Sequence, residues 1–245
     1  MKLRTIITLA LVSLTLTITA QKEKLFEVGL QGGFGSTWIL NQNNYGLQEM
    51  DYDYHYGGGF NFQAGYNFDN SMGLFTEIGF LKQGQKYKDT WTGDADVKRT
   101  INSKYLNIPI FFKYSAGETR ARFRLLAGPQ FCFLQKAEQT YTINGYDLEG
   151  MFELEDKEGN KFDPGAKDIK ERFNSMDVSL VLDLGVDVFV VDNMLYLSVG
   201  ARAYYGLTDI NASAYQLENW DGNYESSHNA GGTIYFGVHY LIAGK

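Results

Sequence analysis

The feature that most constrains the fold is a strict period-two alternation between Met176 and Val190. Every second residue from Met176 onward is Met, Val or Leu, whereas the positions between them include the carboxylates of Asp177, Asp183 and Asp187. Because a β-strand places successive side chains on opposite faces, this segment predicts a strand with one aliphatic face and one acidic face.

The same alternation recurs along the rest of the chain, which predicts an all-β fold. The expected strands lie near 24–37, 56–68, 72–85, 101–115, 120–135, 174–190, 194–206 and 229–241. Each is longer than the ~9–11 residues that a tilted strand needs to cross a bilayer. Short turns at 69–71, 115–119 and 191–193 alternate with long polar connections at 38–55, 86–100, 136–173 and 207–228. This is the plan of an outer-membrane barrel, with short periplasmic turns and long outer loops.

A closed sheet of this kind has two versions, which differ in the direction of the aliphatic rows. In a soluble, lipocalin-like barrel these rows would line a cavity, but they are too bulky for the interior of eight strands. Aromatic residues also gather at strand ends, as in interfacial girdles. They are Phe68, Tyr114, Tyr204, Tyr205 and Tyr240. We therefore predict an eight-stranded antiparallel transmembrane β-barrel of the outer-membrane type, with long extracellular loops.

Residues 1–20 have the pattern of an export signal. Lys2 and Arg4 precede an apolar run over 6–18, and Ala20 stands before Gln21. Such a segment is removed on export, so we expect a signal peptide at 1–20 and the barrel domain at 21–245, located in the bacterial outer membrane. Without the two basic residues the formal net charge of −7 becomes more negative, which argues against nucleic acid as a partner. A single cysteine, Cys132, excludes an intrachain disulfide.

The inner face of the predicted barrel carries charges of both signs. These are Glu27, Glu77, Lys113, Arg122, Arg124, Asp177, Asp183, Asp187 and Arg202. An eight-stranded barrel is narrow enough to be filled by side chains, and an unpaired buried charge costs several kcal/mol. We therefore predict a lumen plugged by ion pairs, in which Arg122 and Arg124 meet the carboxylates of the strand at 174–190. A proton or ion relay is the alternative role of these residues.

The predicted outer loops are rich in aromatic residues, and loops on a rigid scaffold commonly carry function. The residues are Trp38, Tyr45, Tyr52, Tyr54, Trp91, Trp220 and Tyr224. They form either a surface for a ligand or protein partner, or a set of packing and interfacial side chains. Two hairpins are expected above the membrane: one turns at 91–94, and the other turns at Asn144-Gly145.

Signals for metals and catalysis are weak. Oxygen ligands at alternate positions over 156–163 resemble a calcium loop, but Gly159 is misplaced for that motif and lysines interleave, so a solvated loop is expected. His55, His228 and His239 are scattered, and one cysteine offers little to zinc. His228 follows two serines, but the sequence shows no third group that would orient the histidine as a base for nucleophilic catalysis. His239 is expected to be a structural residue of the lumen. We expect no cofactor and no enzymatic activity; a lipid-modifying enzyme and a narrow channel or transport accessory are the alternatives.

The segment Tyr105-Leu106-Asn107-Ile108-Pro109-Ile110, followed by Phe111-Phe112-Lys113-Tyr114, resembles the PorT-like outer-membrane β-barrel family of Bacteroidetes. Ala127-Gly128-Pro129 and the stretch from Tyr205 to Ile210 agree with that resemblance in order and spacing. The resemblance implies an outer-membrane location and a Bacteroidetes source, without an activity. Since Pro109 lacks a backbone N–H, we expect a β-bulge at that position.

Overall fold

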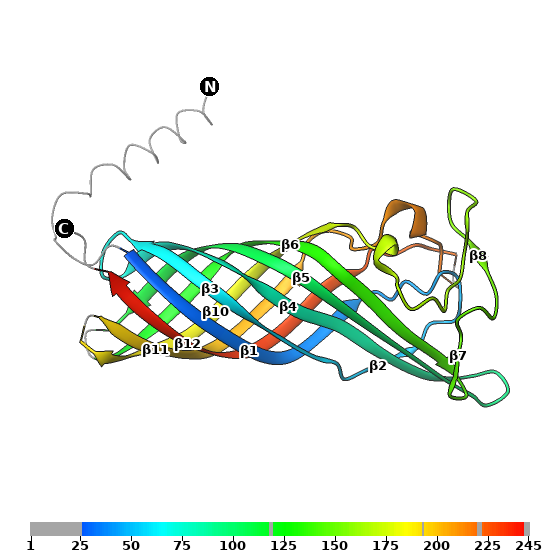
Figure 1. Cartoon of the computed structure of the whole chain (residues 1–245), viewed down its shortest axis with the longest axis horizontal. Coiled ribbons are helices and arrows are strands. Elements are labelled where there is room, and N and C mark those ends of the chain that lie inside the picture. Colours follow the sequence, from blue (N-terminus) through cyan, green and yellow to red (C-terminus); the bar gives the residue numbers. More distant parts are fainter. Residues whose placement is uncertain (1–25, 118–119, 193, 220–221, 243–245) are drawn as a thin grey trace, which may run out of the picture.

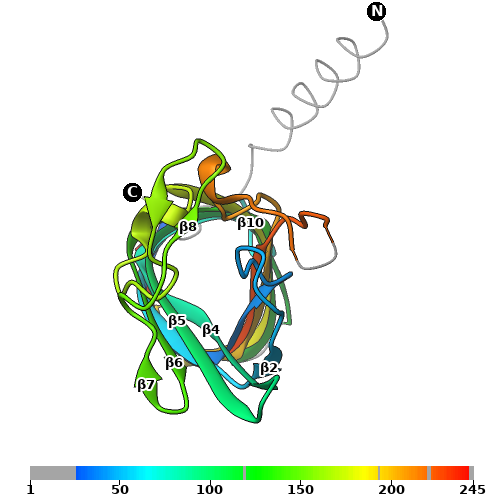
Figure 2. The ribbon, with the colours of Figure 1, turned by 90° about the vertical axis from the view of Figure 1, so that its right-hand side faces the viewer.

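The computed structural model describes residues 26–117, 120–192, 194–219 and 222–242. The predicted signal peptide at 1–20 lies outside these described residues. Eight strands form the wall: β1 (Phe26–Leu40), β3 (Tyr56–Asn67), β4 (Met72–Trp91), β5 (Ala95–Ala116), β6 (Ala121–Ile143), β10 (Met176–Val191), β11 (Leu195–Gly206) and β12 (His228–Ile242). Each wall strand pairs antiparallel with its two neighbours, β1 with β12 and β6 with β10 included, so the sheet closes into a ring (Figures 1 and 2).

Shorter strands and 3-10 helices lie in the long connections at one end of the ring. These are β2 (Asp51–Asp53), β7 (Tyr146–Asp147), β8 (Leu154–Glu155), β9 (Lys161–Phe162) and the 3-10 helices η1 (Lys170–Arg172) and η2 (Ser213–Tyr215). Within the described ranges, no helix is long and apolar enough to cross a membrane. Asn144 and Gly145 both have positive φ, as a two-residue hairpin turn requires, so the hairpin predicted there is confirmed.

The aliphatic rows face outward. Leu180 is 56% exposed, whereas Asp183 on the opposite face of β10 is fully buried. The outward rows form an apolar surface too large to be stable in water. Contact with the hydrocarbon of a bilayer accounts for it. The eight-stranded transmembrane prediction is therefore confirmed, and the soluble alternative is wrong. The prediction that Tyr204 belongs to an aromatic girdle is wrong. Its position in the alternation of β11 directs the side chain into the lumen, where it is buried.

The wall is much taller on one side. β4, β5 and β6 have 20, 22 and 23 residues, whereas β3 and β11 have 12 each. The segment 86–100, counted among the polar connections, is the paired upper part of β4 and β5, joined by a turn at 92–94, so the hairpin predicted with its turn at 91–94 is confirmed. The outward positions of this segment stand above the membrane and are mostly charged or polar. The alternation of apolar and polar residues therefore does not reveal these parts of the strands.

The upper part of the tall wall encloses an apolar core with the outer loops. Its members include Ile39, Tyr87, Val97, Ile101, Tyr141, Leu148, Ile169 and Ile210. Burying a side chain of this size contributes about 1.5–3 kcal/mol, so the loops are held down rather than left free in solvent. We call this cap, which consists of the loops and the upper ends of the tall strands, the outer plug; it comprises residues 41–55, 83–102, 135–175, 207–219 and 222–227.

The bulge expected at Pro109 is wrong. The register between β5 and β6 is the same at Pro109↔Gln130 and at Phe112↔Ala127, so no residue is inserted between them. The Pro109 carbonyl still finds a donor, the hydroxyl of Thr76 at 2.8 Å. The register shifts instead higher on the wall, next to Lys104 and Tyr105.

Candidate functional site

The middle of the lumen is crossed by an ion-paired arginine. Arg202 lies directly opposite Asp183 in the β10–β11 ladder. Its Nε donates to Asp183 Oδ2 at 2.9 Å, while Nη1 and Nη2 donate to the two carboxylate oxygens of Glu77 at 2.7 and 2.8 Å. Glu77 belongs to β4 on another side of the ring. This bidentate pair therefore ties two distant parts of the wall together.

A second arginine extends the network toward the periplasmic end. Arg124 of β6 donates to the Tyr235 hydroxyl at 2.7 Å, and that hydroxyl donates to Asp183 Oδ1 at 2.7 Å. The Arg124 guanidinium also lies 3.5 Å from Asp187. All of these side chains are buried, so their charges depend on one another for compensation.

The third cluster lies at the periplasmic end of the lumen. Lys113 pairs with Glu27 at 2.9 Å, and the Tyr196 hydroxyl donates to the same carboxylate. Nε2 of His239 lies 2.9 Å from the Ser198 hydroxyl, and its Nδ1 lies 3.5 Å from Glu27. Serine, histidine and glutamate thus follow one another in the order of a nucleophilic triad. However, Nδ1 has no hydrogen-bond partner among the described residues, and Ser198 is buried.

Two of the predicted lumen charges are arranged differently from the rest. Asp177 accepts hydrogen bonds from neutral donors, the Thr208 hydroxyl at 2.7 Å and the Asn229 amide at 3.0 Å. Arg122 lies over the Phe189 ring at 4.7 Å and forms no ion pair with a described residue. The expectation that it meets a carboxylate of the neighbouring strand is therefore wrong for Arg122, because its side chain stays near the rim, half-buried.

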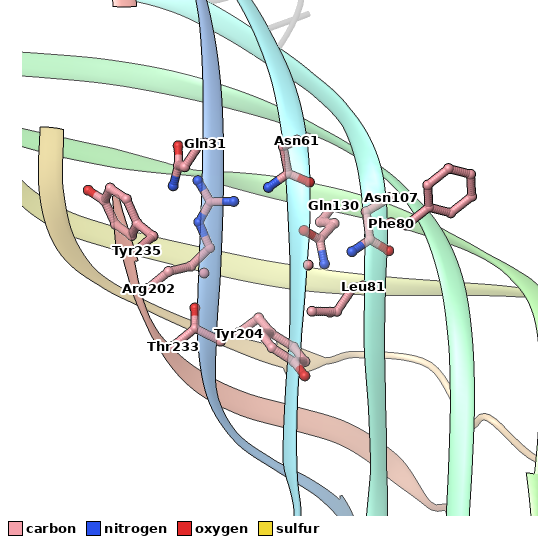
Figure 3. Close-up of a pocket in the computed structure, with 12 residues that line it drawn as sticks. Gln31, Asn61, Phe80, Leu81, Asn107, Gln130, Arg202, Tyr204, Thr233 and Tyr235 are labelled. Carbon is pink, nitrogen blue, oxygen red and sulfur yellow. The ribbon is translucent and has the colours of Figure 1, made fainter. Parts of the chain in front are cut away.

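Neutral amide side chains surround the central ion pairs, and they were not among the residues predicted from the sequence. Gln31, Asn61, Asn107 and Gln130 line a cavity of about 40 Å³ beside Arg202 (Figure 3). This volume holds about three water molecules. The signal that finds these amides is the same inward parity that identifies the charged residues. The lumen is therefore polar throughout its middle, with charges at its crossing points.

The outer plug is organised around Tyr45. Its ring lies between two buried guanidiniums, with Arg99 at 5.3 Å and Arg172 at 5.4 Å from the ring centroid. Arg99 also donates to Gln139 Oε1 at 2.9 Å and to the carbonyl of Asn43 at 3.0 Å. Tyr45 has a φ of 57°, a left-handed conformation that a bulky residue rarely adopts. The contacts of Tyr45 with both arginines, together with the hydrogen bond from Arg99 to the carbonyl of Asn43, tie the loop 41–50 to β5 and to η1.

The predicted loop surface divides into exposed and buried residues. Tyr52 and Tyr54 are exposed, Tyr54 at 74%. Tyr45 is buried rather than on the surface, because it fills the centre of the plug. Trp38 and Trp91 belong to β1 and β4 and are half-buried, because those strands run further than predicted. Tyr224 is half-buried and donates its hydroxyl to Asp209; Trp220 lies outside the described residues.

The calcium-like segment serves turn formation. Asp156 Oδ1 accepts from the backbone amides of Glu158 and Asn160 at 2.8 and 2.9 Å, and Asp163 accepts from that of Gly150 at 2.7 Å. In the part of the chain that the structure describes, no group of His, Cys, Asp or Glu side chains is placed to hold a metal ion.

The two remaining histidines lie in the outer part of the molecule. Nδ1 of His55 lies 2.7 Å from the Thr37 hydroxyl and Nε2 lies 3.1 Å from Asn102 Oδ1. Burial lowers the pKa of the His55 imidazole. His228 stacks on Tyr205 at 5.6 Å, and its Nδ1 lies 3.1 Å from the carbonyl of Thr208. Both histidines thus contact ordinary structural neighbours.

A closed ring of eight antiparallel strands, apolar outside and ion-paired within, defines an outer-membrane β-barrel. The family model described as outer membrane protein beta-barrel domain matches residues 19–212. The chain belongs to this family, and its location is the bacterial outer membrane.

Several solved structures are similar to this chain at low identity. Neisserial surface protein A (NspA) has 14% identity and a TM-score of 0.43, covering 89% of this chain and 97% of that one. OprG from Pseudomonas aeruginosa has 10% identity and a TM-score of 0.42, covering 91% and 98%. The outer membrane enzyme PagL has 10% identity and a TM-score of 0.39, covering 85% and 97%. No curated protein matches the chain.

Proposed function

We propose that this protein is a non-enzymatic barrel that closes its own lumen and presents an ordered loop platform at the cell surface. The observation that carries the proposal is the pairing of Arg202 with Glu77 and Asp183 across the middle of the lumen. Above it, the outer plug packs the loops onto the tall strands. A rigid wall with well-packed loops suits recognition of a ligand or protein partner, because little ordering entropy remains to be lost on binding.

Single-channel recording in planar bilayers tests the closed lumen. We expect the wild-type protein to give no stepwise conductance at moderate voltage, because the charges that cross the lumen are mutually compensated. Discrete open steps from the wild-type protein would contradict the proposal and favour a narrow channel or transport accessory. That alternative is supported by one observation, the cavity lined by neutral amides between the ion pairs.

Photo-crosslinking in intact cells tests the platform. A photoreactive phenylalanine analogue at Tyr54, the most exposed tyrosine of the loop 41–55, should yield a discrete crosslinked product. The matched control carries the same analogue at Phe68, which is also exposed but lies at the periplasmic turn. Equal products from both sites, or none from Tyr54, would contradict a surface platform.

The absence of enzymatic activity is supported by the burial of Ser198 inside the lumen and by the distance of 3.5 Å between His239 Nδ1 and Glu27, which is long for the hydrogen bond that would orient a catalytic base. A nucleophile needs both an oriented base and access to substrate. Replacing Ser198 with alanine should therefore leave the lipid A of the host unchanged by mass spectrometry. We also assign the chain to the PorT-like members of its family, on the motif from Tyr105 to Tyr114, which lies wholly in β5.

A further inference from the structure

Three lysines form a row across the outer face of the tall wall. Lys82 of β4 lies directly opposite Lys104 of β5, and Lys104 lies directly opposite Lys136 of β6. All three are exposed. Like charges placed opposite one another on neighbouring strands destabilise a sheet, and a bound anion would offset that repulsion.

A β-bulge creates this alignment. Below it, Tyr105 pairs with Leu134 and both point inward; above it, Lys104 pairs with Lys136 and both point outward. The extra residue on β6 is Gln135. Without the insertion, Lys104 would face Gln135, and Lys136 would have the inward parity. Bulges that re-aim a side chain are features of the fold rather than defects, so the wall is built to bring the third lysine into the row.

The row lies at the upper edge of the lipid-facing surface. Directly below it in the same ladders are Phe80, Leu106 and Phe133, which pair with one another in the same order. The ammonium group of Lys104 lies 4.4 Å from the Phe80 ring centroid. Because Phe80 lies below the row, the charged end of Lys104 rests over an aromatic ring at the edge of the apolar surface, a cation–π contact that places this long amphipathic side chain at the membrane interface.

The charge of the row is only partly neutralised by the protein. Among the described residues, Lys136 pairs with Glu138 at 2.6 Å, whereas Lys82 and Lys104 form no ion pair. Higher on the same face, Lys88 stands opposite Lys98, and these two lysines pair with Asp53 at 3.5 Å and with Asp96 at 2.6 Å, respectively. On the other side of Lys82, the residues at the same level of β3, β1 and β12 are uncharged. They are Gly58, Phe34 and Ile234. The basic patch is thus confined to β4–β6 of a chain whose net charge is −7.

We propose that the lysine row Lys82–Lys104–Lys136 binds the phosphate-bearing headgroup of an outer-leaflet lipid, whose acyl chains lie on the Phe80–Leu106–Phe133 row below. A lipid fits better than a soluble anion, because the cationic and apolar rows are adjacent and face the bilayer. Each basic residue at a membrane surface adds attraction for anionic headgroups. The inference does not depend on the closed lumen or on the loop platform.

Native mass spectrometry of the purified barrel in neutral detergent tests the proposal. The probes are bisphosphorylated lipid A and the same lipid with its phosphates removed. We expect the wild-type protein to prefer the phosphorylated probe, and we expect the triple variant Lys82→Gln, Lys104→Gln, Lys136→Gln to bind it more than ~10-fold more weakly.

The matched control makes the same charge change in the outer loops, with Lys157→Gln, Lys161→Gln and Lys170→Gln, and should bind within about twofold of wild type. Because all six lysines are exposed, both variants are expected to fold, which heat-modifiable migration on gels verifies. Equal binding of the two lipids by wild type would overturn the proposal, and so would equal losses in the two triple variants. Full retention by the row variant would overturn it as well.

Discussion

Replacing Arg202 with methionine tests the central ion pair most directly. The guanidinium donates three hydrogen bonds at 2.7–2.9 Å, two to Glu77 and one to Asp183. Charge-assisted bonds contribute about 1.5–3 kcal/mol each, but their sum overstates the loss. The cavity of about 40 Å³ beside Arg202 lets water enter the space that the guanidinium leaves. We therefore expect the free energy of unfolding to fall by about 3–5 kcal/mol, as for other broken buried pairs.

Urea unfolding of the barrel refolded into lipid vesicles, followed by tryptophan fluorescence, measures this loss. The control is Arg120→Met, because Arg120 is 79% exposed and pairs with the equally exposed Asp192 at 3.5 Å. Its expected cost is at most ~1 kcal/mol. Adding Glu77→Gln to the Arg202→Met variant should restore part of the stability, since one stranded charge is removed. Unfolding free energies of the two arginine variants within ~1 kcal/mol of each other would refute the reasoning.

Two further predictions concern the outer plug. Tyr45→Ala removes two cation–π contacts of about 0.5–2 kcal/mol each and leaves a cavity, so amide exchange should accelerate in the loop 41–50. Tyr45→Phe keeps the ring and loses only the long hydrogen bond of 3.5 Å from Arg99, so it should exchange much more slowly than Tyr45→Ala. Equal acceleration in the wall strands would contradict a local role. Since burial lowers the pKa of His55, the unfolded loop binds the proton more readily. The stability of this loop is thus present above the usual histidine pKa of ~6.5 and lost as the pH falls below it. The protection factor of the Tyr52 amide, which is its exchange rate divided into the intrinsic rate at the same pH, should fall on acidification in wild type but not in His55→Gln. The same pH dependence of the protection factor in both proteins would count against this prediction.

The alternation of apolar and polar residues was sufficient for the membrane wall, because lipid outside and charge inside give each strand two chemically distinct faces. Above the membrane that contrast fades. The outward positions of β4 and β5 there are lysines and the inward ones are Tyr87 and Val97, so the same strands look like polar loops in sequence.

The alternation along each strand also shows which charged side chains point into the lumen, but it does not show which of them form ion pairs. Arg202 and Glu77 are 125 residues apart and belong to strands that are not neighbours. Their contact depends on the diameter and stagger of the closed ring, which no local pattern contains. Tyr45 illustrates the same limit in the loops, since its burial between Arg99 and Arg172 arises from three segments that are distant in sequence.

The pairing of β1 with β12 determines when this molecule can enter a bilayer. The two strands join along 15 residue pairs, from Phe26↔Ile242 to Leu40↔His228, so the first wall strand to leave the ribosome waits for the last. Until that seam forms, both strands have unpaired backbone groups that hydrocarbon cannot solvate. The ring can therefore close only after β12 has been synthesised, and until then the two open edges must be shielded from pairing with other chains.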